Sequence, residues 1–97
     1  MKQKKVRIPS DTLEFLKSLH PDIKKKLKAG LKEIAENPLS GKALKEELEG
    51  LRSFRVGKYR IVYREDPSAL EIIAAGVRET IYEDTLRKLL KEKDANR

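Results

Sequence analysis

The feature that most constrains the fold of this chain is the run Leu51–Tyr63, where apolar and basic residues alternate on both sides of Gly57 and Lys58. Strict alternation over such a run predicts half-buried strands, and a Gly-Lys pair between them predicts a tight turn. We therefore expect a hairpin over residues 51–65. One of its faces would turn an apolar set toward a core: Phe54, Val56, Tyr59, Ile61 and Tyr63.

The other face of this hairpin would carry Arg55, Arg60 and Arg64. Residues 52–64 hold five positive charges and no acidic residue. Structural surfaces usually mix the two signs of charge, so a small sheet with one cationic face is suited to bind an anionic partner.

Composition narrows the class of protein and the chemistry open to it. At 97 residues the chain is expected to form one domain, residues 1–97. It has no cysteine, and His20 is its one histidine. A thiolate metal site, a cysteine nucleophile and a histidine-based zinc site are therefore excluded, and we expect no metal and no cofactor.

The net charge of +7 makes a nucleic acid or an acidic protein the leading class of partner. The alternative is a surface rich in lysine and glutamate, of the kind found in thermophile proteins. No apolar run approaches the roughly 18 residues of a membrane span. Because no apolar segment follows the basic N-terminus, a secretory signal is not expected either. The expected location is the cytoplasm.

Periodicity and helix breakers predict two helices in the first half of the chain. Alternation at residues 4–8 predicts a strand that stops at Pro9. Ser10 is the expected N-cap of a first helix, and Pro21 suits the first turn of a second helix that ends near Asn37. The two helices, joined at His20, would form an antiparallel hairpin. Their expected buried faces hold Leu13, Phe15, Leu16 and Leu19 in the first helix, and Ile23, Leu27, Leu31 and Ile34 in the second.

The second half of the chain predicts a loop, three strands and a helix. Residues 38–50 are loop-like, with a short helical turn at residues 45–47 and possible anchors at Leu39, Leu44 and Leu48. The nearly continuous apolar run at residues 70–77 predicts a strand covered on both faces. Residues 83–93 predict a terminal helix. The fold class is therefore α+β: a small, mostly antiparallel sheet in β-α-α-β-β-β-α order, with the helical hairpin on one face and the basic side chains on the other.

Two segments of this chain resemble the RelE/ParE toxin superfamily of type II toxin–antitoxin systems. In the first, residues 54–63, an aromatic, a basic and an apolar residue precede Gly57, and Tyr-Arg, two apolar residues and Tyr63 follow. In the second, Gly76 and Arg78 are followed four residues later by Tyr82. The resemblance covers nearly the whole chain and implies the element order derived above.

The resemblance implies one of two activities. RelE-like toxins are metal-free endoribonucleases that cleave mRNA in the ribosomal A site, by attack of a 2′-hydroxyl on the adjacent phosphate. ParE-like toxins inhibit DNA gyrase and cut nothing. A third alternative is an inactive relative that only binds its antitoxin or RNA. The implied partners are a small acidic antitoxin, in a hetero-oligomer, together with mRNA and the ribosomal RNA.

The resemblance also assigns roles to single residues. Arg60 matches the arginine that stabilises the transition state, Arg78 matches a second catalytic arginine, and Tyr82 matches the tyrosine that stacks on the substrate or exchanges a proton with it. Arg55 falls where the family has a basic residue that faces the scissile phosphate. Ser53 replaces a second basic residue, with Arg52 beside it. The expected catalytic residues are thus Arg60, Arg78 and Tyr82, and the expected phosphate-binding residues are Arg52, Arg55 and Lys58.

The chemistry of these groups agrees with the resemblance in part. Clustered guanidinium groups suit a pentavalent phosphate because each offers a planar fork of donors. The general base stays open, because arginine and an ordinary tyrosine, with a pKa of about 10, remain protonated at neutral pH. The candidates are Tyr82 beside Arg60 and Arg78, Lys58, or ribosomal RNA.

Each of these residues also has a structural alternative. Arg60 and Arg78 could be ion-pair partners of an acidic residue (Glu65, Glu71 or Glu79). Tyr59 and Tyr63 share a strand face with Ile61 and are expected in the core, and His20 is expected to cap a helix. The lysines of the second helix would form a solvated face or contact ribosomal RNA, and three leucines of the terminal helix are candidate antitoxin contacts: Leu86, Leu89 and Leu90.

Overall fold

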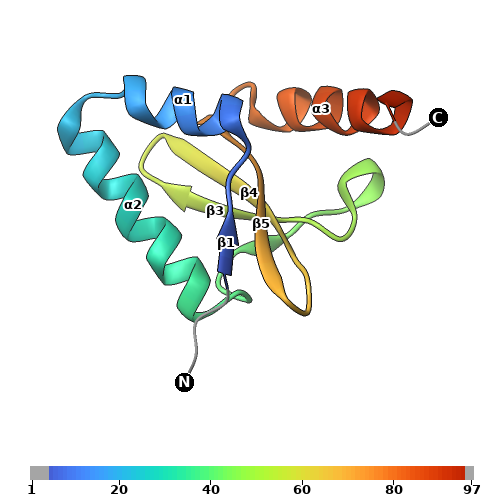
Figure 1. The fold of residues 1–97 in the computed structure, drawn as a ribbon, viewed down its shortest axis with the longest axis horizontal. Coiled ribbons are helices and arrows are strands. Elements are labelled where there is room, and N and C mark those ends of the chain that lie inside the picture. Colours follow the sequence, from blue (N-terminus) through green and yellow to red (C-terminus); the bar gives the residue numbers. More distant parts are fainter. Residues whose placement is uncertain (1–4, 96–97) are drawn as a thin grey trace.

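The computed structural model describes residues 5–95, with side chains through Glu92, and this part of the chain forms one five-stranded sheet with helices on both faces (Figure 1). The elements are β1 (Lys5–Arg7), α1 (Ser10–Ser18), α2 (Pro21–Glu36), β2 (Lys42–Ala43), the 3-10 turn η1 (Glu46–Leu48), β3 (Arg52–Val56), β4 (Tyr59–Glu65), β5 (Ala69–Val77) and α3 (Ile81–Ala95). The predicted α+β order is confirmed. The short strand β2 is an addition, because two exposed residues carry no periodic signal.

The strands follow the order β1-β5-β4-β3-β2, in which β1 pairs with β5 in parallel and all other pairs are antiparallel. The middle strand is therefore β4, and β5 lies beside it as an interior strand. The register of β5 on β4 passes from Ile72–Tyr63 to Ala74–Val62, so Ile73 is an extra residue in β5. Such a β-bulge interrupts the hydrogen-bond ladder at one point.

The helical hairpin forms where the sequence predicts it. Pro21 occupies the first position of α2, and the His20 side chain caps this helix by accepting the Asp22 N–H at 3.2 Å. In α1, by contrast, Pro9 is the N-cap and Ser10 is already helical, so the predicted cap was wrong by one residue. The buried face of α1 is also rotated from the prediction, because Thr12 is buried and Leu13 is exposed.

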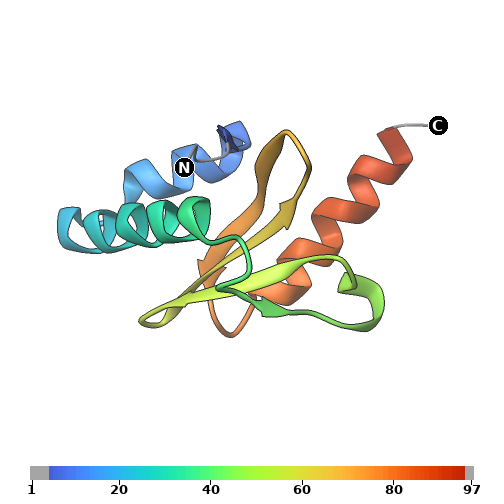
Figure 2. The same ribbon diagram turned by 90° about the horizontal axis from the view of Figure 1, so that it is seen from below.

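Helices cover both faces of the sheet, with the α1–α2 hairpin on one side and α3 on the other (Figure 2). The first core lies between the hairpin and the sheet and includes Leu27, Ile34, Ile61, Tyr63, Leu70 and Ile72. The second core lies beneath α3 and includes Leu51, Val62, Ile73, Ala74 and Ile81. The predicted basic face is thus corrected: α3 occupies part of it, and basic side chains gather at the turn end of the β3–β4 hairpin. Of the described helices, none is long and apolar enough to cross a membrane.

The loop between α2 and β3 is held to the sheet by Tyr63. Its hydroxyl donates to the Pro38 carbonyl at 2.7 Å and accepts the Gly41 N–H at 2.9 Å. Leu44 and Leu48 pack against the second core, as predicted, whereas the third expected anchor, Leu39, is exposed.

Candidate functional site

Arg55 and Arg60 stand directly opposite each other in the β3–β4 pair. Tyr59 and Ile61 pack into the first core, so alternation places Arg60, and Arg55 opposite it, on the other face of the sheet. Like charges in directly opposed positions destabilise a sheet. Two arginines in this position cost stability when no anion is bound, but they concentrate positive charge. This arrangement is typical of a site that binds an anion.

Hydrogen bonds orient both guanidinium groups. Arg55 Nε donates to the Gly57 carbonyl at 3.2 Å, which holds the side chain against the turn. Arg60 Nη1 donates to Ser53 Oγ at 3.2 Å, and Ser53 is itself buried. Ser53 is therefore a residue of this site that sequence reasoning noted only as a missing basic group. The sequence feature that could have indicated this role is a small hydroxyl residue two positions before Arg55, on the same face of the strand.

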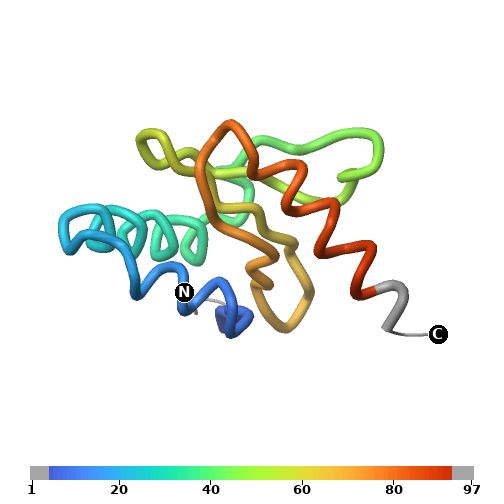
Figure 3. The backbone as a smooth tube through the Cα atoms, turned by 90° about the horizontal axis from the view of Figure 1, so that it is seen from above, coloured from blue at the N-terminus to red at the C-terminus, as the bar shows by residue number. Residues whose placement is uncertain are grey.

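The end of β5 brings Arg78 to the same place. Arg60 pairs with Gly76 in the β4–β5 ladder, and the Arg78 N–H donates to the Lys58 carbonyl at 3.0 Å. The turn of the β3–β4 hairpin and the end of β5 therefore lie side by side, as Figure 3 shows. This contact joins Lys58 and Arg78, which are 20 residues apart in the sequence.

Tyr82 is the second residue of α3, four residues after Arg78. Its neighbour Ile81 is buried in the second core, whereas the Tyr82 side chain is 37% exposed. The first turn of α3 thus places the ring at the surface next to the end of β5. The structure brings together Arg55, Lys58, Arg60 and Arg78, with Tyr82 at their border.

Arg52 does not join this cluster. It is three residues from Arg55 along β3, so the two side chains leave opposite faces of the strand. Arg52 pairs with Tyr63, and its Nη1 donates to the Gly41 carbonyl at 2.8 Å. The structure therefore assigns Arg52 a contact with the loop after α2, away from the other basic residues.

The structural alternatives are resolved for several residues. Glu71, one of the acids considered as a partner for Arg60 and Arg78, forms an ion pair and hydrogen bond with Arg64. The Tyr59 ring packs against Phe15 with centroids 6.4 Å apart, as expected of a core residue. In α3, Leu89 packs against the second core, whereas Leu90 is 55% exposed. Within the described residues, no group of three or more histidine or acidic side chains is arranged to hold a metal ion.

A mostly antiparallel sheet with a helical hairpin on one face is also the fold of the E. coli toxin RelE. The chain belongs to the ParE toxin family of type II toxin–antitoxin systems (parDE), whose family model matches residues 6–82. Comparison with curated protein sequences gave no significant match.

Solved structures agree with this assignment. A chain of the toxin–antitoxin complex RelBE2 from Mycobacterium tuberculosis is 30% identical, with a TM-score of 0.70 over 79% of this chain and 100% of that chain. A mutant of the E. coli toxin RelE in the free state superposes with a TM-score of 0.75 over 94% of this chain and 98% of that chain, at 18% identity. A chain of the YoeB–YefM complex from Staphylococcus aureus has a TM-score of 0.66 at 22% identity, over 79% of this chain and 99% of that chain. The last two similarities are of fold alone.

Proposed function

We propose that this chain is the toxin of a type II toxin–antitoxin module and acts as a ribosome-dependent endoribonuclease on mRNA. The observation that carries the proposal is the direct opposition of Arg55 and Arg60, completed by Arg78 from the end of β5. Three arginines at neighbouring backbone positions offer guanidinium groups that suit the charge developing on a phosphate during cleavage. A surface that only docks on another protein does not need this arrangement.

The proposed reaction is a transesterification that needs no metal. A 2′-hydroxyl of the RNA attacks the adjacent phosphorus, so that the O2′–P bond forms as the P–O5′ bond breaks. The 2′ proton passes to a base, and the departing 5′ oxygen receives a proton. Arg60 and Arg78 bind the phosphoryl oxygens, Arg55 and Lys58 hold the RNA backbone, and Tyr82 stacks on a base or exchanges a proton. The base itself is Tyr82, Lys58 or a group of the ribosomal RNA.

We further propose that an acidic antitoxin binds this chain in a hetero-oligomer. Support comes from the net charge of +7 and from the structures of toxin–antitoxin complexes with a similar chain. Leu90, which is exposed on α3, is the clearest apolar contact point for such a partner.

The test is the double change Arg60→Ala with Arg78→Ala, followed by induction in growing cells and mapping of mRNA 5′ ends. The unchanged protein should stop growth and produce cuts within codons on translating ribosomes. The double variant should produce none, because it lacks the groups that stabilise the phosphorane. Arg87→Ala with Lys91→Ala is the matched control, since both residues are exposed on α3 and the loss of charge is the same.

A second function is favoured by one observation, the ParE description of the family model. A gyrase inhibitor would leave transcripts intact and cause gyrase-dependent DNA breaks. Growth arrest that survives the loss of Arg60 and Arg78 would contradict the nuclease and support the inhibitor. If the unchanged protein causes neither mRNA cuts nor growth arrest, the chain is an inactive relative.

A further inference from the structure

Lys88, in the middle of α3, binds three acceptors that all belong to other elements. Its Nζ donates to the Ile73 carbonyl of β5 at 2.6 Å, to Thr12 Oγ1 of α1 at 3.1 Å and to Asp11 Oδ1 at 3.3 Å. A lysine ammonium group has three N–H donors. Every one of them therefore has an acceptor, and none of these acceptors is on the helix that carries the lysine.

Two of the three acceptors lie where the fold leaves them without a regular partner. Ile73 is the bulged residue of β5, and β1 pairs with β5 only from Ala69 to Glu71. Its carbonyl therefore lies beyond the end of one ladder and at the interruption of the other. Thr12 is 4% exposed, so its hydroxyl is also withdrawn from water. An unpaired polar group in such a place destabilises the fold. Lys88 therefore provides a hydrogen-bond donor for the Ile73 carbonyl of the sheet and for the Thr12 hydroxyl of α1.

Asp11 adds charge to this contact. Its other carboxylate oxygen, Oδ2, lies 3.2 Å from Lys88 Nζ. Burial alone would raise the pKa of the Asp11 carboxyl, but the hydrogen bond and charge of Lys88, with the Thr12 N–H, bring this pKa below its ordinary value. The ionised form of Asp11 is thus the one that the contact favours.

The packing on either side of Lys88 is open. A hollow of about 410 Å³ lies toward β1 and is lined by Arg7, Pro9, Glu71 and Glu92 as well as Lys88. A second hollow of about 290 Å³ lies toward α1 and is lined by Phe15, Gly76, Thr80 and Lys88 among others. Apolar contact between α3 and the second core comes from Ile81 and Leu89. Thr85, which is fully buried, lies between these two residues. The Lys88 hydrogen bonds, next to Leu89, add polar contacts from α3 to β5 and α1.

We propose that Lys88 is a positioning residue that fixes the rotation of α3 on the sheet and so holds Tyr82 beside Arg78. The two residues are six apart, or about 9 Å along a rigid helix. A rotation of about 20° would move a ring on the surface of a helix of this diameter by about 2 Å. Misplacement of a catalytic group by about 1 Å can lower a rate on the order of 100-fold. The role given to Tyr82 rests on the proposed nuclease function, whereas the hold on α3 does not.

The test compares Lys88→Ala with Lys91→Ala, a change of the same kind at an exposed lysine one turn further along α3. Amide hydrogen exchange in α3 should be at least ~10-fold faster in Lys88→Ala, with exchange in β4 unchanged, because local opening is decoupled from global unfolding. The kcat of ribosome-dependent mRNA cleavage should fall ~10-fold or more at constant KM, as expected when a group acting in the transition state is displaced. Lys88→Arg, which keeps the charge and several donors, should restore most of both.

A second set of variants tests the same contact from the other side. Thr12→Val with Asp11→Ala removes two acceptors and leaves Lys88 in place, so it should also speed exchange in α3. Adding Lys88→Ala to this pair should change little, because residues that share one contact are not additive. Likewise, Lys88→Ala should lower kcat no further in a Tyr82→Ala background.

Unchanged exchange in α3 on the loss of Lys88 would overturn the proposal at once. Faster exchange at unchanged kcat would also overturn it, provided that Tyr82→Ala inactivates the enzyme. If the unchanged protein cleaves no mRNA, the nuclease function has failed, and the exchange data alone decide whether Lys88 holds α3.

Discussion

At the scale of single residues, Tyr63 holds the loop after α2 to the sheet. It is fully buried, and its hydroxyl joins the Pro38 carbonyl and the Gly41 N–H, 25 and 22 residues away in the sequence. Gly41 is needed here, since a Cβ at this position would lie 2.5 Å from Tyr63 Oη. Burial raises the pKa of the Tyr63 phenol above its ordinary value, so the protonated form that donates to Pro38 is the favoured one.

We expect Tyr63→Phe to lower the free energy of unfolding by about 1–3 kcal/mol, because the half-buried Pro38 carbonyl and the buried Gly41 N–H lose their partner. Urea denaturation at pH 7 measures this change. Tyr59→Phe is the control, since that ring is half-buried at the edge of the core and the change should be within about 0.5 kcal/mol.

The stability difference between the unchanged protein and Tyr63→Phe should depend on pH. A phenol whose pKa is raised by folding contributes stability that is complete below the ordinary value of 10.0 and is lost as the pH rises through the folded value. The difference in unfolding free energy between the unchanged protein and Tyr63→Phe should therefore shrink above pH 10. An undiminished difference at pH 11 would contradict this account.

At the scale of elements, the contact of α2 with β3 explains why Gly30 lies inside α2, although glycine lowers the stability of a helix. Gly30 is buried in α2, and a Cβ built on it would lie 2.9 Å from Val56 Cγ2 and 3.3 Å from Phe54 Cε2. Both neighbours belong to β3, so the helix has a glycine here because this strand lies so close to it.

We expect Gly30→Ala to destabilise the protein by about 1–3 kcal/mol, because the gain of roughly 1 kcal/mol in helix propensity is outweighed by overpacking against a stiff, branched side chain. In a Val56→Ala background, the same change should become neutral or stabilising. Thermal denaturation of the four proteins in this cycle measures the coupling. Equal effects of Gly30→Ala in the two backgrounds would show that Val56 is not the obstacle.

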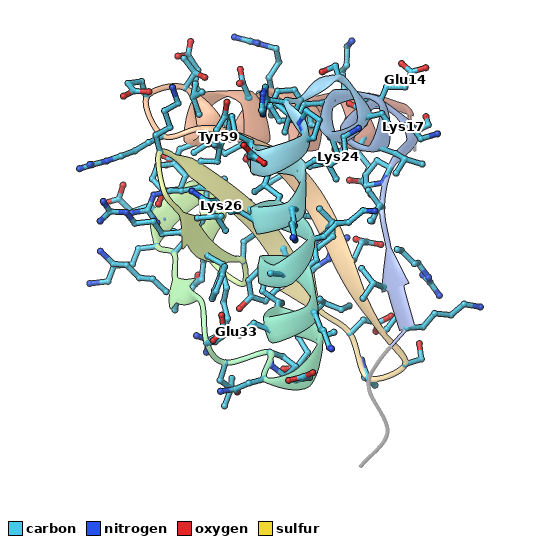
Figure 4. All side chains as sticks on the ribbon, turned by 90° about the vertical axis from the view of Figure 1, so that its left-hand side faces the viewer. Glu14, Lys17, Lys24, Lys26, Glu33 and Tyr59 are labelled. Carbon is cyan, nitrogen blue, oxygen red and sulfur yellow. The ribbon has the colours of Figure 1, made fainter. Side chains whose placement is uncertain are left out.

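Over the whole molecule, the basic surface extends beyond the arginine cluster. Figure 4 shows Lys24 and Lys26 on the outer side of α2, with Lys17 on the neighbouring helix. Lys26 and Arg55 line the same hollow of about 320 Å³ between α2 and the outer half of β3. Lys26 is therefore the lysine of α2 that lies near Arg55, and Glu33 lines the same hollow. We propose that Lys24 and Lys26 contact a large, folded RNA at the border of the phosphate site.

We expect Lys24→Ala with Lys26→Ala to weaken binding to ribosomes and to lower the steepness of its salt dependence by about 1.4, two contacts at roughly 0.7 each. The kcat at saturation should not change, because neither lysine belongs to the arginine cluster. Binding at a series of salt concentrations measures the slope, with Arg87→Ala plus Lys91→Ala as the charge-matched control. A slope equal to that of the unchanged protein would restrict RNA contact to the arginine cluster.

Most of the elements of this fold could be predicted from the sequence, because their signals are local. Alternation of apolar and basic residues determined the β3–β4 hairpin and placed Arg55 and Arg60 on one face. His20 and Pro21 determined the start of α2, since capping depends on residues next to one another. The spacing from Gly76 to Tyr82 indicated the second half of the site through a resemblance.

The tertiary structure alone decided what covers each face and which side chains meet. Periodicity shows that a face is apolar, but not which element packs on it, so the position of α3 over the sheet could not be predicted. The separation of Arg52 from Arg55, the hydrogen bond of Ser53 to Arg60 and the bulge at Ile73 depend on strand register, which is a property of pairs of strands. The Lys88 contact spans 76 residues to Thr12 and 15 to Ile73. The three acceptors come together only after the chain has folded, so no local pattern in the sequence could predict the Lys88 contact.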